Sequence, residues 1–157
     1  YVGRVLCVRP VFGRPPRRFP HLVGVLPGRG RFRGSPRVMA VIDTSGSIST
    51  GNLADISAEL AHMTRNFVVI VVECDAEIHG IYRYCGPITA VRGRGGTDLR
   101  VPFASDVLRA HRPDLVVYFT DGLGPAPENP PNVPVIWALT VGGIQPAPWG
   151  RIVRMGE

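Results

Sequence analysis

Short runs of apolar residues recur along the chain and predict the strands of a buried sheet. Each run is almost uninterrupted and is followed by small or polar residues. Runs of this kind are typical of central parallel strands that are covered on both faces. Four segments share the pattern: residues 38–42, 67–73, 116–120 and 135–139. The mixed alternation of residues 78–84 predicts a neighbouring or edge strand, and residues 150–155 predict a short last strand.

Two amphipathic stretches between these runs predict helices. Apolar residues recur at helical spacing over about residues 51–65, with Ser49 or Thr50 available as the N-cap. A second apolar face runs through residues 98–111. Strands that alternate with helices form βαβ units with right-handed crossovers. We therefore expect an α/β fold: a Rossmann-like, doubly wound and mostly parallel sheet with helices on both faces.

The distribution of charge sets the first part of the chain apart. All 18 basic residues of the 157-residue chain are arginine, and nine of them lie in residues 1–37, where there is no Asp or Glu. The twelve acidic residues all lie in residues 38–157. We interpret residues 1–37, which are rich in Arg, Pro and Gly, as an extension or linker from a preceding domain, and residues 38–157 as the domain proper. The start at Tyr1 indicates a piece of a longer protein.

Composition excludes several classes of protein. The lack of lysine excludes mechanisms that need one, such as a P-loop or a Schiff base. The longest aliphatic run, residues 67–72, is far shorter than the roughly 18 residues of a membrane-spanning helix. Three cysteines without a CxxC pair give no disulfide framework and favour a reducing, cytoplasmic location.

Polar residues follow three of the predicted elements and form a candidate metal site. Asp43-Thr-Ser-Gly-Ser47 ends one strand, residues 95–98 (Gly-Gly-Thr-Asp) precede a helix, and residues 120–122 (Thr-Asp-Gly) end another strand. In open α/β sheets, ligands bind beyond the carboxyl ends of the strands. Hydroxyl and carboxylate oxygens suit a hard divalent cation such as Mg²⁺, whereas zinc favours His or Cys.

These residues resemble the metal-ion-dependent adhesion site of von Willebrand factor A (VWA) domains. The resemblance covers about three quarters of the chain and carries the whole motif in the family's order. It implies that Ser45, Ser47 and, in one state of the site, Thr97 bind the metal directly, and that Asp43 and Asp121 act largely through bound waters. The residues expected to support these loops are Gly46, Gly95, Gly96, Asp98 and Gly122. We expect Gly46, Gly95 and Gly96 to allow close approach where a Cβ would obstruct.

A narrower resemblance concerns residues 40–47, 73–76 and 93–98. They are similar to the VWA-like C-terminal domain of predicted bacterial metallopeptidases associated with MoxR-type AAA+ ATPases. The resemblance implies a protein-interaction module that performs no catalysis, in which Mg²⁺, or else Mn²⁺ or Ca²⁺, ligates an Asp or Glu of a partner. The expected partner is an AAA+ ATPase or an associated subunit. The proline-rich residues 122–131 predict no helix, so we expect a reduced VWA fold.

Other functions remain as alternatives. The chain could be an accessory or regulatory part of a metal-dependent peptidase or hydrolase, but it contains no HExxH motif, and Asp98 is the one spare carboxylate in the motif loops. Nucleic acid could bind the arginines and phenylalanines of residues 1–37, although packing of this segment on the acidic domain is the simpler reading. Asp75 is interpreted as a strand-end cap in preference to a supporting group of the metal site, and Cys74 as a buried apolar residue.

Overall fold

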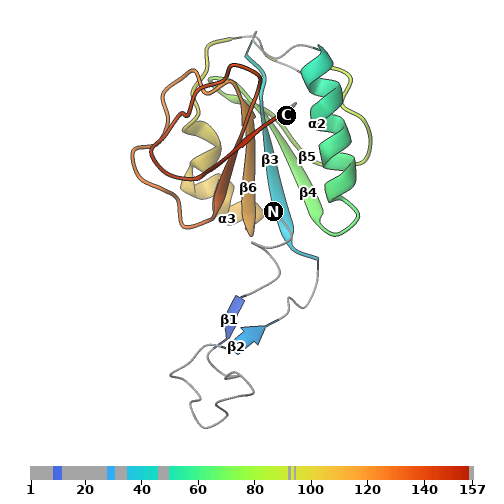
Figure 1. Ribbon diagram of the computed structural model, residues 1–157, viewed down its shortest axis with the longest axis vertical. Helices are drawn as coiled ribbons and strands as arrows, with labels where there is room; N and C mark the ends of the chain where they lie inside the picture. The colour runs from blue at the N-terminus through green and yellow to red at the C-terminus, as the bar shows by residue number, and fades with distance from the viewer. Residues whose placement is uncertain are drawn as a thin grey trace. The chain divides into compact units, whose positions relative to one another are not determined.

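The computed structural model describes residues 9–11, 28–30, 35–45, 50–91, 93 and 95–155. The chain divides into two compact units, Tyr1–Pro36 and Arg37–Glu157. In the first unit, β1 (Arg9–Val11) pairs antiparallel with β2 (Gly28–Gly30). The second unit contains the predicted sheet and its helices (Figure 1).

The second unit is built on a six-stranded sheet in the order β5-β4-β3-β6-β7-β8. All neighbouring strands run parallel except β5, which pairs antiparallel with β4 at one edge. This arrangement confirms the predicted Rossmann-like α/β fold. The strands are β3 (Arg37–Asp43), β4 (Val68–Cys74), β5 (Ile78–Arg83), β6 (Leu115–Thr120), β7 (Val135–Leu139) and β8 (Arg151–Arg154).

The central strands are buried on both faces because their sequences are apolar at nearly every position. In β6 and β7 every residue is buried, and in β3 only Arg37 is exposed. Helix α2 (Thr50–Met63) buries Leu53, Ile56 and Leu60. Helix α3 (Ser105–His111) packs through Val107 and Leu108 against a cluster on the sheet. The two helices lie on opposite sides of the sheet in Figure 1.

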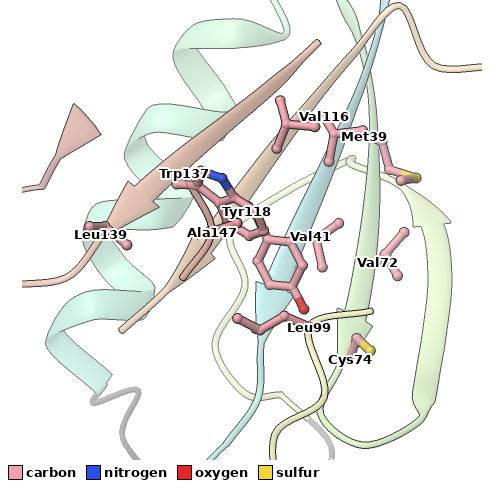
Figure 2. Close-up of a cluster of buried hydrophobic side chains, with 11 residues drawn as sticks. Met39, Val41, Val72, Cys74, Leu99, Val116, Tyr118, Trp137, Leu139 and Ala147 are labelled. Atoms are coloured by element: carbon pink, nitrogen blue, oxygen red, sulfur yellow. The ribbon is translucent and has the colours of Figure 1, made fainter. Parts of the chain in front are cut away.

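The cluster under α3 contains the largest side chains of the core. Trp137 of β7 and Tyr118 of β6 lie beside each other, with ring centroids 5.3 Å apart (Figure 2). Met39 and Val41 of β3 extend the same face, and all four side chains are at most 1% exposed. Alternate residues of each strand point to opposite faces, so the sheet has a second buried face under α2.

The predicted helix over residues 98–111 is only half right. The α-helix begins at Ser105, and it is preceded by a 3₁₀ turn, η1 (Val101–Phe103). Pro102 has no N–H to donate to a helical hydrogen bond. Upstream, the Asp98 side chain accepts the N–H of Arg100, which fixes a local turn instead of a helix.

The segment after β6 carries no helix, as its prolines predict. Residues 121–134 form an irregular connection to β7, so the domain lacks a helix that a larger doubly wound sheet would have there. Within the described residues, neither α2 nor any other helix combines the length and hydrophobicity that crossing a membrane requires.

Candidate functional site

The candidate site lies where the strand order of the sheet reverses. The chain passes from β3 through α2 to β4 on one side, and β6 pairs with β3 on the other. Asp43 is the last residue of β3 and Thr120 is the last residue of β6, and these two strands are parallel neighbours. In open sheets this switch point, beyond the carboxyl ends of the strands, is where ligands bind.

Asp43 is held in a fixed position by hydrogen bonds. Its side chain is fully buried, its Oδ1 accepts the N–H of Ser45 at 3.0 Å, and its Oδ2 accepts the hydroxyl of Thr120 at 2.7 Å. The Thr120 oxygen in turn accepts the N–H of Gly122 at 3.0 Å. Thr120 belongs to the predicted segment 120–122, but its position at the end of an apolar strand does not reveal this role. Its hydroxyl ties β3 and the loop after β6 together.

The electrostatic environment of Asp43 favours a cation. Burial raises the pKa of the Asp43 carboxyl above its ordinary value, the hydrogen bonds from Thr120 and Ser45 oppose this rise, and the charge of Asp121 adds to it. A bound cation relieves both the burial of the carboxylate and the repulsion between the two acids. The described donors are oxygens, so they fit a hard ion such as Mg²⁺.

Asp121 lies in a loop whose shape depends on glycine. Its Oδ1 accepts the N–H of Leu123 at 2.9 Å, and its carbonyl oxygen accepts the N–H of Ile144 at 2.8 Å. Gly122, between Asp121 and Leu123, has a φ of +80°, and a Cβ there would collide with the carbonyl oxygen of Ile144. The loops after β6 and β7 are therefore joined directly behind Asp121.

The loop that carries Thr97 is hydrogen-bonded to the segment after β4 and to the segment after β6. The N–H of Asp98 donates to the carbonyl of Asp75, and the N–H of Leu99 donates to the carbonyl of Pro125. A Cβ at Gly124 would lie 2.9 Å from the methyl group of Thr97, so this loop also contacts the segment after β6. The third predicted segment is thus anchored between the end of β4 and the loop that begins at Asp121.

Asp75, which was interpreted as a strand-end cap, organises this loop. Its carboxylate is 4% exposed, and it accepts the N–H of Gly95 at 3.0 Å and that of Glu77 at 3.1 Å. The Nε2 of His79 lies 2.8 Å from Oδ1 of Asp75. Burial raises the pKa of Asp75, but the two N–H groups and His79 lower it by more than burial raises it. The resulting pKa is about 2.

The close approach expected at Gly95 and Gly96 is found at only one of them. A Cβ at Gly95 would lie 3.1 Å from Asp75, whereas one at Gly96 would meet open space. The tightest position is Gly93, at a φ of +120°, where a Cβ would collide with Thr44 and lie 2.6 Å from Asp75. The requirement for glycine at Gly93 therefore follows from its positive φ and from the Thr44 hydroxyl and Asp75 carboxylate that lie against it, and the requirement at Gly95 follows from Asp75.

The remaining predicted residues differ in what the structure says of them. Asp98 forms a two-point ion pair with Arg100, with 2.7 Å between Nη2 and Oδ2, and this arginine lowers the pKa of Asp98. Gly46 and Ser47 lie outside the described residues. Ser45 is buried at the start of the loop after β3. Cys74 is fully buried, as predicted.

The ligand set at this rim depends on hydroxyl groups. Among the described residues, no group of three or more His, Cys, Asp or Glu side chains is placed to hold a metal ion. The predicted set contains two carboxylates, Asp43 and Asp121, and its other members are hydroxyls. A metal here would be held by a mixed oxygen set and not by a carboxylate cluster.

An open α/β sheet with polar side chains gathered at its switch point defines a Rossmann-like domain with a rim site. The model of one protein family, described as a VWA-like domain (DUF2201), matches residues 38–156. The chain therefore belongs to this family of VWA-like domains. No curated protein and no solved structure matches the chain.

Proposed function

We propose that the domain is a protein-interaction module that binds Mg²⁺ at the rim of the sheet and, through it, a carboxylate of a partner protein. The proposed ligands are Asp43, Ser45, Ser47, Thr97 and Asp121. The observation that carries the proposal is the position of Asp43, which is buried at the switch point, fixed by Thr120 and exposed to the charge of Asp121. Mn²⁺ and Ca²⁺ are the alternative ions.

Neutral ligands explain why such a site would recruit an acidic partner. A cation held partly by hydroxyl groups keeps much of its positive charge, so an open coordination position attracts a further carboxylate. We propose an AAA+ ATPase or an associated subunit as the partner, on the strength of the narrower family resemblance.

The two described cysteines, Cys74 and Cys85, are free thiols, which supports a reducing, cytoplasmic setting.

The competing proposal is a metal-dependent hydrolase. Hydrolysis needs a general base within reach of a metal-bound water. Asp98 was the spare carboxylate for that role, and its two oxygens are engaged by Arg100. This pairing supports the non-enzymatic proposal. Turnover of a peptide or phosphoester that disappears in Asp98→Asn, with metal still bound, would instead support the enzyme.

Titration calorimetry of metal-stripped protein with Mg²⁺, Mn²⁺ and Ca²⁺ tests the metal site. We expect saturable Mg²⁺ binding in the wild type and binding that is weaker by about 10–100-fold or lost in Asp43→Asn and Thr97→Ala. Asp55→Asn is the matched control, because Asp55 is an exposed carboxylate on α2. A wild-type chain that stays folded and binds none of the three ions would refute the proposal.

A further inference from the structure

Three large aliphatic side chains are exposed at the rim beside the candidate metal site. Leu123 is 58% exposed, Val141 is 86% exposed and Ile144 is 54% exposed. They line one cavity of about 350 Å³, which we call the rim cavity, and Asp121 lines it too. Exposed apolar groups that gather at one place mark an interaction surface, whereas single ones need no explanation.

The rim cavity has a rigid backbone frame. The N–H of Ile144 donates to the carbonyl of Asp121 at 2.8 Å, and the N–H of Gly143 donates to the carbonyl of Thr140 at 2.9 Å. Gly122 packs directly against the carbonyl of Ile144. These contacts hold the loops after β6 and β7 together, so a ligand would not have to order them. A preformed surface of this kind binds with a smaller entropic cost.

Charge near the rim cavity selects among the possible occupants. Arg154, the last residue of β8, donates from its guanidinium to the carbonyl of Gly143 at 3.3 Å. Gly143 lines the rim cavity, so a positive charge lies at the loop that bears Val141 and Ile144. On the side of Asp121 the proposed metal would supply a second positive charge. Asp121 brings a carboxylate to the rim cavity, so an acidic segment would be attracted there only when the proposed metal offsets that charge. With the metal bound, an aliphatic surface between two cations complements a segment that combines apolar and acidic residues.

We propose that the rim cavity binds an aliphatic side chain of an extended acidic segment of a partner protein. The carboxylate next to that side chain would reach the metal site, so the inference rests on the proposed function and adds to it the sequence character of the partner. The specific occupant is an Asp or Glu with Leu, Ile or Val close to it in the chain.

Selection from a displayed peptide library provides the test. The library carries one fixed aspartate with randomised flanking residues, and it is panned against the full chain in Mg²⁺ and again in EDTA. We expect enrichment of aliphatic residues next to the aspartate, in Mg²⁺ only. A selected peptide, made synthetically, should bind Val141→Ser and Ile144→Ser about tenfold or more weakly than wild type, because an apolar contact is lost. The Mg²⁺ affinity of these two variants should equal that of the wild type.

Val153→Ser is the matched control, because Val153 is an exposed valine of β8 that does not line the rim cavity. It should bind the peptide as the wild type does. Selection of peptides without any aliphatic preference, by protein that binds Mg²⁺, would overturn this inference and leave the metal proposal intact. Aliphatic enrichment that persists in EDTA would support the rim cavity and count against metal ligation of the partner. Equal losses in Val153→Ser would also overturn the inference.

Discussion

Replacing Gly122 with alanine is expected to destabilise the domain by about 2–5 kcal/mol and to weaken Mg²⁺ binding. The φ of +80° at this position disfavours any residue with a Cβ by about 1–2 kcal/mol. The new methyl group would also collide with the carbonyl oxygen of Ile144, and relieving that contact costs about 1–3 kcal/mol more. Separation of the two loops would break the hydrogen bond behind Asp121 and displace its carboxylate.

Gly142→Ala is a closely matched control for this experiment. Gly142 has the same φ of +80°, but a Cβ there would meet no atom within 4 Å. We therefore expect its free energy of unfolding, measured by denaturant-induced unfolding, to fall by only about 1–2 kcal/mol. Mg²⁺ binding should not change. Equal losses in the two variants would show that the contact with Ile144 does not hold the loops after β6 and β7 together.

The sheet could be predicted from the sequence because a strand that is buried on both faces is an almost uninterrupted run of apolar residues. A strand such as β3 is apolar at five successive positions before Asp43, and its limits differ from the prediction by one residue at each end. The second helix was predicted too long, because its apolar spacing continues through η1 although Pro102 interrupts the hydrogen-bond pattern. Periodicity reports which face is buried, and it does not report which backbone hydrogen bonds form.

The candidate site could be predicted only in part, for a similar physical reason. Asp43 ends β3 and Asp121 follows β6, so the parallel sheet alone places them at one rim. Asp75 also follows a strand, but its role depends on a hydrogen bond with Gly95, twenty residues later in the sequence. Nothing in local spacing encodes that contact. A register shift between β4 and β5 at Glu73 and Cys74, immediately before Asp75, is likewise visible only in the folded chain.

Asp75→Asn is expected to cost about 3 kcal/mol of folding free energy at pH 7 and to weaken Mg²⁺ binding about tenfold or more. The buried carboxylate accepts two backbone N–H groups and faces His79. An asparagine would turn an amide N–H₂ toward one of those donors and leave it unsatisfied. Because Asp75 holds the loop that carries Thr97, the loss should affect the proposed metal site as well as stability.

The pH dependence of stability distinguishes this role from a general structural defect. The pKa of Asp75 is lowered to about 2, below the value of about 3.9 for an unfolded aspartate. A group of this kind stabilises the folded chain above the unfolded pKa, and its contribution is lost as pH falls through the folded pKa. The difference in unfolding free energy between wild type and Asp75→Asn should therefore shrink between about pH 4 and pH 2.

Asp98→Asn provides the comparison from the same loop. Its ion pair with Arg100 lies near the surface, where such pairs contribute about 0–1 kcal/mol. We therefore expect Asp98→Asn to lose only a small amount of unfolding free energy at pH 7. Its difference from the wild type should decrease only slightly at low pH. A difference between wild type and Asp75→Asn that stays constant from pH 6 to pH 2 would show that the charge of Asp75 does not hold this loop, and that the variant is destabilised by packing alone.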